Sequence, residues 1–285
     1  VREANEHLEE IDPLHQPMML EWLPFSDHPQ VAAACYQGWS LCLRGDYRRA
    51  ERQVEAAIRL AETYNHPGSL ALALLFAAAM YRQLGHVHLA GARAERAFEV
   101  TRTPDLHIWH MTAQCALGWH KALSGDRAGL AMIEASLEEL AELSGQDRYQ
   151  RPMLWYTDAC FALGELALAE DYLDQCLMIA RERSSLFVPE LSIHLARVYQ
   201  RQGRSADTVR QLTEQALEQA REHDDLHHQL CALELWLDVV DSSDSHASDE
   251  LRRLLKEVTQ SDAPVLLRWR TLLDKQLSRP AAFES

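Results

Sequence analysis

Residues 38–57 read GWSLCLRGDYRRAERQVEAA, in which a small residue, a bulky residue, a glycine turn, an aromatic residue and two spaced alanines follow one another. The turn glycine recurs at intervals of 40, 40, 39 and 39 residues, at Gly45, Gly85, Gly125, Gly164 and Gly203. Self-similarity with such a period is typical of solenoids, in which each unit buries its apolar face only against its neighbours. This pattern places function on an exposed repeat surface rather than in one catalytic centre.

The residues around each turn glycine form columns. Seven residues before it, every unit carries a small side chain: Gly38, Ala78, Gly118, Thr157 and Ala196. Small residues on one helix face let a neighbouring helix approach closely. The glycine suits the left-handed end of a first helix, and Asp46 and Asp126 can cap the second helix. Each unit is therefore predicted to be an antiparallel helical hairpin. The third unit is the least regular, because Gly129, Leu130 and Glu134 break the columns.

The composition agrees with an all-α fold. The chain has 285 residues, 47% of them hydrophobic, with good helix formers dominant and no run of alternating β-branched residues. The longest apolar run, from Leu70 to Tyr81, is shorter than the roughly 20 residues that span a bilayer. The net charge of −15 repels phosphate backbones. The six scattered cysteines form no CxxC pair and suit a reducing compartment. We therefore expect a cytoplasmic protein that binds neither nucleic acid nor a membrane.

The column pattern resembles a tetratricopeptide repeat (TPR) with a period longer than the usual value of about 34 residues. The resemblance extends from about Gln30 to Glu222. It implies a right-handed superhelix, an α-solenoid of about six TPR-like hairpins followed by capping helices. In such solenoids the first helices of successive hairpins line a concave groove.

Several short motifs resemble the long-period TPR region of large bacterial signalling proteins. They are DHPQV at 27–31, GW at 38–39, HPGSLA at 66–71, LHIW at 106–109, GW at 118–119 and RP at 151–152. The similar proteins are predicted STAND-type ATPases fused to a class III nucleotide cyclase or a Ser/Thr kinase, and LuxR-type activators of the MalT kind. The resemblance implies a non-catalytic module for protein interaction or regulation within a larger signalling ATPase. The alternative that it implies is a sensor domain for a small molecule such as a carbohydrate.

The predicted boundaries follow the turn glycines and the proline-rich and serine-rich stretches. A partial repeat and a connector occupy 1–29. The TPR-like units follow at 30–67, 68–105, 106–148, 149–187 and 188–222, and the first helix of a sixth unit occupies 225–241. A linker, the serine-rich run 242–248, and capping helices occupy 242–278, and a frayed tail occupies 279–285. Because the chain begins at Val1 within what reads as a second helix, we expect it to be a piece of a longer protein.

The predicted binding residues lie on the first helices, near the small column. They are Tyr36, Trp39, Phe76, Arg82, Trp119, Trp155, Asp158, Arg197 and Gln200. They predict a groove that is aromatic toward the N-terminus and more polar toward Arg197. Such a groove suits a protein or peptide partner, upstream domains of the same polypeptide, or a small ligand. In the alternative interpretation, Trp39 and Trp119 pack between hairpins instead of lining the groove.

No motif predicts a catalytic residue, a cofactor or a metal. The sequence contains no GxSxG, HExxH or GxxxxGK[ST] motif. Two groups of residues contain side chains that could bind a metal: His107, His110, Cys115 and His120, and His223, Asp224, Asp225, His227 and His228. Neither group supplies ligands at a recognisable spacing, and the two aspartates suit a helix N-terminus. We interpret both groups as surface histidines and helix caps.

Overall fold

The protein is all-α in the part of the chain that the computed structural model describes, residues 27–144, 150–182, 185–240, 244–259 and 261–277. Its α-helices are α2 (Pro29–Leu43), α3 (Tyr47–Thr63), α4 (Pro67–Leu84), α5 (Val87–Val100), α6 (His107–Ala122), α7 (Arg127–Ser144), α8 (Gln150–Leu163), α9 (Leu166–Glu182), α10 (Val188–Arg201), α11 (Ala206–Glu222), α12 (Leu226–Leu235), α13 (Ser245–Leu255) and α14 (Pro264–Leu277). A 3₁₀ turn, η3 (Pro104–Leu106), precedes α6, and a π-helical turn, η5 (Trp236–Val240), follows α12. The predicted all-α class is confirmed over these ranges, and none of these helices is both long and apolar enough to cross a membrane.

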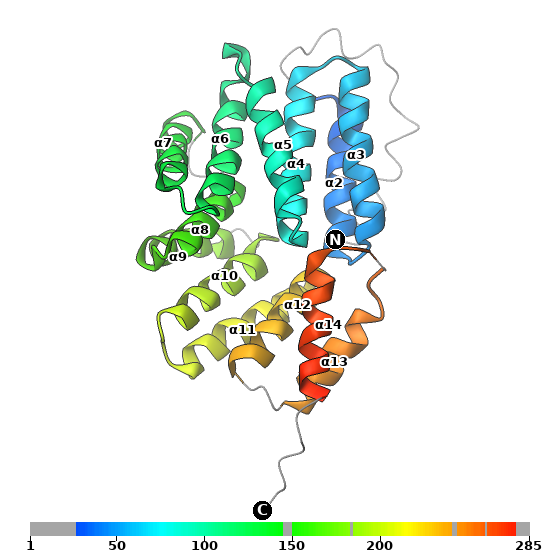
Figure 1. Ribbon diagram of the computed structural model, residues 1–285, viewed down its shortest axis with the longest axis vertical. Helices are drawn as coiled ribbons and strands as arrows, with labels where there is room; N and C mark the ends of the chain where they lie inside the picture. The colour runs from blue at the N-terminus through cyan, green and yellow to red at the C-terminus, as the bar shows by residue number, and fades with distance from the viewer. Residues whose placement is uncertain (1–26, 145–149, 183–184, 241–243, 260, 278–285) are drawn as a thin grey trace, which may run out of the picture.

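Consecutive helices pack in pairs, α2 with α3, α4 with α5, α6 with α7, α8 with α9 and α10 with α11 (Figure 1). All five turn glycines have positive φ angles, from 71° at Gly203 to 85° at Gly125, as predicted for left-handed helix ends. Asp46 caps α3 by accepting the backbone N–H of Arg49, and Asp126 accepts the N–H of Ala128 at the start of α7. The predicted helix–glycine turn–helix unit is therefore confirmed, while the hand of the superhelix and the number of repeats stay predictions.

Two of the motifs that support the resemblance have a local structural role. In the His-Pro pairs at 28–29 and 66–67, the histidine caps a helix and the proline begins it. Nδ1 of His28 accepts the backbone N–H of Gln30 at 3.2 Å, and Nδ1 of His66 accepts that of Ser69 at 3.1 Å. Proline suits the first helical position because its φ is already helical and no N–H is lost. These motifs therefore mark where first helices begin.

The small residues allow close helix contact in the third unit. A Cβ atom added to Gly118 on α6 would lie 2.5 Å from the carbonyl oxygen of Gly129 on α7, so the two backbones touch. Gly118 belongs to the small column, and Gly129, one of the residues that break the columns, is its partner at the point of closest approach.

The C-terminal helices return to the first two hairpins (Figure 1). The backbone N–H of Thr259 donates to the carbonyl of Gly45 at 3.1 Å, and the Cβ of Pro264 lies beside Gly85. Helix α12 contacts α2, and α14 contacts α4. The sequence predicts that the last helices cap one end of the stack; in the structure they also join its two ends. We call these interactions the closure contacts.

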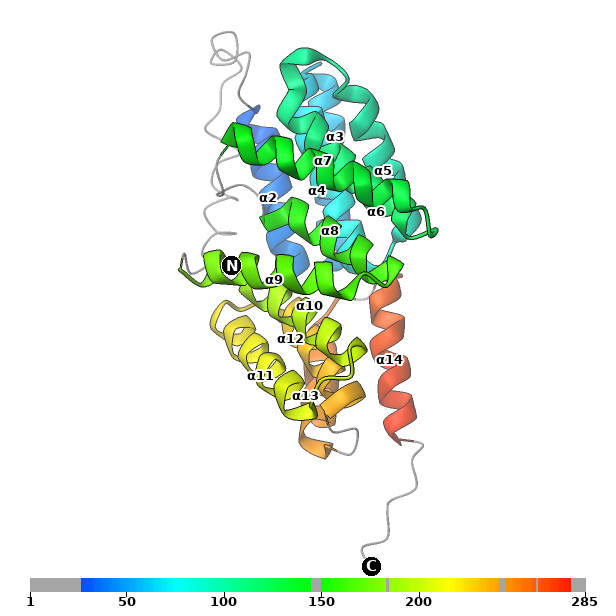
Figure 2. The ribbon, with the colours of Figure 1, turned by 90° about the vertical axis from the view of Figure 1, so that its left-hand side faces the viewer.

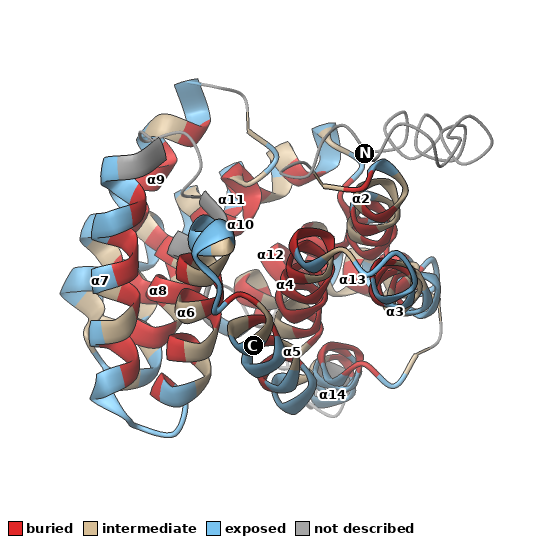
Figure 3. Ribbon diagram, turned by 90° about the horizontal axis from the view of Figure 1, so that it is seen from above, coloured by how far each residue is buried: buried red, intermediate tan, exposed pale blue. Residues whose placement is uncertain are grey.

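Burial follows this arrangement. Buried residues face the interior shared by the first helices, and exposed residues cover the outer sides of α3 and α7 (Figure 3). All six cysteines are buried, as expected for small apolar side chains. The polar run assigned to the 242–248 linker is helical from Ser245, because Asp244 caps α13 by accepting the N–H of Ala247 at 3.0 Å. The predicted partial repeat before residue 27 and the tail at 279–285 lie outside the described residues.

Candidate functional site

Charged side chains from four first helices meet in the interior. The Arg82 guanidinium on α4 donates to Oδ2 of Asp158 on α8 at 2.6 Å and to Oε1 of Glu190 on α10 at 2.5 Å. The side chains of Arg82 and Glu190 are only 7% and 4% exposed. Two hydrogen bonds from one planar guanidinium therefore tie three repeat units together at their inner face.

Two histidines complete this group, which we call the inner charge network: Arg82, Asp158, Glu190, His194, Asp225 and His228. Nδ1 of His194 lies 3.2 Å from Oδ1 of Asp158. Nδ1 of His228 lies 2.6 Å from Oδ2 of Asp225, and its Nε2 lies 3.8 Å from Oε2 of Glu190. Asp225 also accepts the backbone N–H of His228 at 3.0 Å, so the predicted capping role of this aspartate is confirmed.

Neighbouring charges favour the ionised forms of Arg82, Glu190 and His228. Burial alone lowers the pKa of Arg82, but Asp158 and Glu190 outweigh burial and raise this pKa. Burial raises the pKa of Glu190, but Arg82, His228 and His194 outweigh it and bring this pKa down to about 2. Burial likewise opposes the charge of His228, yet Asp225 and Glu190 raise its pKa. The charges therefore compensate one another in a region with little water.

We predict that the stabilising contribution of Glu190 is lost in acid. Its folded pKa of about 2 lies below the ordinary 4.5, so the contribution is complete above pH 4.5 and declines as the pH falls toward 2. The measurement is the difference in unfolding free energy between the wild type and Glu190→Gln below about pH 5, where the neighbouring histidines are protonated in both proteins and their titration cancels. We expect this difference to shrink by up to about 1.4 kcal/mol per pH unit as the pH falls from about 4.5 toward 2. A difference that stays constant down to about pH 3 would contradict an ionised Glu190.

The predicted aromatic residues form two clusters beside this network. Trp155 lies under the Arg82 guanidinium, with the carbon of that group 5.5 Å from the ring centroid, and its centroid is 4.9 Å from that of Trp119. Both tryptophans are buried. The second cluster joins Tyr36 and Trp39 to Phe76 through edge contacts, with centroid distances of 5.0 and 6.4 Å. The inner face is therefore filled largely by the chain's own side chains.

The structure brings together most of the residues predicted from the columns. Arg82, Asp158, Trp155 and Trp119 form one group, and Tyr36, Trp39 and Phe76 form another. Trp119 packs between hairpins, which is the second of the two interpretations left open by the sequence. Trp39 is half-buried, packing on Phe76 and on Phe187, whose ring centroid is 6.4 Å away.

Two predicted residues lie outside these groups, and four network members were not among the predicted binding residues. Arg197 forms an ion pair of 3.5 Å with Glu234 on α12, and Gln200 is half-buried near the end of α10. Glu190, Asp225 and His228 were missed as members of the site. His194 shares with Trp155 a repeat column that the sequence places along the predicted groove, although it was not among the predicted binding residues.

The histidine groups weighed as metal sites are used in separate contacts. Nε2 of His107 lies 2.7 Å from a carboxylate oxygen of Glu139, and His110 lies 3.1 Å from the Thr101 hydroxyl. His227 forms a 2.8 Å hydrogen bond with Tyr47, and burial lowers the pKa of this histidine well below its usual value. Within the second group, Asp225 and His228 pair with each other. The interpretation as surface histidines is wrong for His227 and His228, which are only 2% and 4% exposed. Neither group brings three ligand atoms together in the part of the chain that the structure describes.

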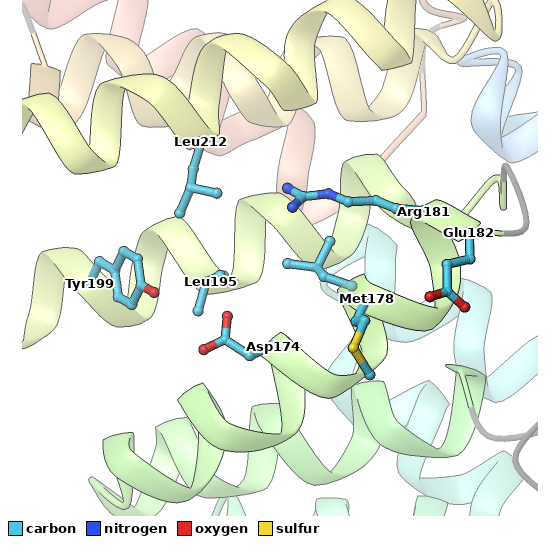
Figure 4. Close-up of a pocket in the computed structure, with 8 residues that line it drawn as sticks. Asp174, Met178, Arg181, Glu182, Leu195, Tyr199 and Leu212 are labelled. Carbon is cyan, nitrogen blue, oxygen red and sulfur yellow. The ribbon is translucent and has the colours of Figure 1, made fainter.

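An open groove of about 530 Å³ lies between α9, α10 and α11 (Figure 4). We call it the outer groove; it is lined by Asp174, Leu177, Met178, Arg181, Glu182, Leu195, Tyr199 and Leu212. Helix α9 forms one wall and lies between the upper hairpins and α10–α12 (Figure 2). Met178 lies at the rim of the groove and is 60% exposed, and Figure 4 shows its thioether end directed away from Leu195 and Leu212. On this surface Met178 is exposed, and Tyr199 and Leu212 are partly exposed.

Charge is distributed unevenly around the outer groove. Burial and the neighbouring carboxylates of Glu170 and Asp171 raise the pKa of Asp174. Arg181, near the other end of α9, donates to the side chain of Gln215 at 3.2 Å. The end of the groove at Asp174 therefore offers crowded negative charge beside an apolar floor.

No protein-family model matches this sequence, and none of the curated proteins searched matches it either. The likeness to TPR regions of signalling proteins therefore rests on the motifs and columns alone, and its functional meaning is a proposal.

Proposed function

We propose that this chain is a non-catalytic, TPR-like interaction module of a larger bacterial signalling ATPase, and that it binds an amphipathic helix of a partner in the outer groove. The partner is either a separate protein or an upstream domain of the same polypeptide. The observation that carries this proposal is the exposed Met178 at the rim of a groove whose lining includes leucines from three helices, Leu177, Leu195 and Leu212. Helical grooves of this kind take the apolar face of a partner helix.

The chemistry of the groove defines the expected partner. Met178 is flexible and polarisable, so it can adapt to an apolar anchor of the partner, while Leu195 and Leu212 contribute to the floor and wall. The negative end at Asp174 favours a lysine or arginine about one helical turn from that anchor. The partner segment is therefore an amphipathic helix with a basic residue beside its apolar stripe.

The small-molecule alternative has less support. It requires an indole face on which a carbohydrate can stack, and Trp119 and Trp155 cover each other and lie next to Arg82. Their exposed fractions of 3% and 1% leave no face of these two indoles available. The third tryptophan of the predicted groove, Trp39, is partly buried against Phe76 and Phe187.

We predict that Met178→Asp abolishes partner binding without unfolding the module. A photo-crosslinking amino acid at position 178 of the full-length natural protein identifies the partner segment, and binding of that segment is then measured for wild type and variant. We expect at least a tenfold loss, because a carboxylate replaces the apolar contact next to Asp174. Leu89→Asp is the matched control: this leucine is 43% exposed on α5, away from the groove, and its substitution should leave binding unchanged.

Three results would contradict the proposed function. The first is crosslinking at 178 to no segment that forms an amphipathic helix with a basic residue. The second is an equal loss of binding in Leu89→Asp and Met178→Asp. The third is turnover of a substrate by the purified chain.

A further inference from the structure

We propose that Glu51, His86 and Asp262 form a binding site for a divalent first-row transition metal, with Zn²⁺ as the expected ion. One potential ligand atom from each of these side chains lies within 4.8 Å of the other two. The three residues come from separate parts of the chain and meet at the closure contacts. The site is independent of the outer groove and of the proposed partner.

The backbone around the three residues is held in place by packed elements. Glu51 lies in the second turn of α3, His86 in the turn between α4 and α5, and Asp262 just before α14. Next to them, the Cβ of Pro264 lies 3.2 Å from where a Gly85 Cβ would stand, and Thr259 donates to Gly45. The ligands are thus brought together by the same contacts that join the C-terminal helices to the first hairpins (Figure 1).

The imidazole of His86 is the central observation. Its Nε2 atom is buried and lies 3.5 Å from Oε1 of Glu51, and no hydrogen bond of ordinary geometry reaches it. At that distance the contact with Glu51 is at the limit for a hydrogen bond. The ring is fixed by an edge contact with Tyr81, at a centroid distance of 5.9 Å, and makes no capping bond to α5. A buried ring nitrogen whose nearest acceptor is this distant is poorly satisfied, and a metal ion between the two side chains would satisfy it.

The carboxylates supply the charge that a cation needs. Glu51 and Asp262 each offer a carboxylate oxygen within 4.8 Å of a ring nitrogen of His86. A divalent ion between the two carboxylates would replace their mutual repulsion by attraction. One imidazole with two carboxylates suits Zn²⁺ or a neighbouring first-row ion better than Mg²⁺ or Ca²⁺, which prefer oxygen ligands.

The spacing is compatible with such an ion. Zn²⁺ bonds of about 2.0–2.2 Å place tetrahedral ligand atoms roughly 3.4 Å apart, close to the separation of His86 and Glu51. Asp262 is exposed, so its side chain can rotate toward the pair without disturbing the core. Three protein ligands leave a fourth position for water. Binding would connect α3, the α4–α5 turn and the segment before α14, and would therefore stabilise the closed arrangement.

The test is metal titration of the full chain after its metal has been removed with a chelator. We expect ZnCl₂ to bind at one ion per chain in calorimetry and to raise the midpoint of thermal unfolding, whereas MgCl₂ does neither. His86→Ala and Asp262→Asn should each lower Zn²⁺ affinity at least tenfold. His88→Ala is the matched control, because this exposed histidine lies two residues from His86 and outside the cluster.

Each alternative result would overturn the proposal. Either no stoichiometric binding, or wild-type affinity in His86→Ala, would show that the cluster is not a metal site. An equal loss of affinity in His88→Ala would show that Zn²⁺ binds surface histidines instead. Circular dichroism of each metal-free variant separates a lost ligand from a lost fold. A failure of this test does not contradict the proposal that the outer groove binds a partner helix.

Discussion

Replacing Arg82 with methionine is expected to destabilise the protein by about 3–5 kcal/mol at neutral pH. The substitution leaves Asp158 and Glu190 buried without the guanidinium to which each is bonded, and the Glu190 side chain is only 4% exposed. A buried charge that loses its partner keeps its desolvation cost, which is why one deletion has so large an effect. The measurement is the unfolding free energy from urea denaturation at pH 7.

The control for this experiment is an ion pair on the surface. Arg96 pairs with Glu62 between α5 and α3, where the two side chains are 41% and 42% exposed, so Arg96→Met should cost less than about 1 kcal/mol. The double variant Arg82→Met/Glu190→Gln should be more stable than the sum of the two single changes predicts, because it removes one unpaired charge. Equal effects of Arg82→Met and Arg96→Met would contradict the inner charge network as a buried, ionised unit.

Replacing Gly129 with alanine is expected to destabilise the protein by roughly 1–3 kcal/mol or more. The added methyl group would overlap the carbonyl oxygen of Gly118 and would lie 2.9 Å from the backbone nitrogen of Ala122. Both obstacles are backbone atoms of α6, so α6 and α7 must move apart. This loss should exceed the gain in helix propensity from alanine, and thermal unfolding measures the net result.

Gly68→Ala is the matched control, because this glycine also lies in the first turn of a helix. Its added Cβ would lie 3.5 Å from the nearest atom, so the change should be neutral or stabilising by up to about 1 kcal/mol. If Gly129→Ala were as stable as Gly68→Ala, the close approach of α6 and α7 would not limit packing in the third unit.

The repeat could be predicted because it depends on residues that are close together in the chain. A glycine at the end of one helix and a cap a residue or two later, as with Gly45 and Asp46, determine a turn by local geometry. Small residues at a fixed distance from that turn determine which helix faces meet. The prediction failed for the 242–248 linker, where a serine-rich composition concealed an aspartate cap and a helix from Ser245.

The candidate sites were harder to predict from the sequence than the repeat. The columns placed Arg82, Trp155 and Asp158 on the inner face. They did not predict the hydrogen bond between Arg82 and Glu190, because these two residues are 108 positions apart. The outer groove forms between α9 and the following pair of helices, and Met178 belongs to no column that marks it as exposed. The candidate metal ligands at 51, 86 and 262 share no spacing motif at all.

By itself, the sequence determined that this protein is built from helical hairpins joined by left-handed glycine turns, since those features arise from neighbouring residues. Only the tertiary structure decided that the two ends of the helical array meet. The rotation between successive hairpins accumulates along the array, and its total depends on every side chain packed between them. That accumulated rotation brings His227 to Tyr47, 180 residues away, and it buries Arg82 among carboxylates of other repeats. No local sequence pattern determines this total rotation. The contacts in the interior and the closure contacts could therefore be found only in the folded chain.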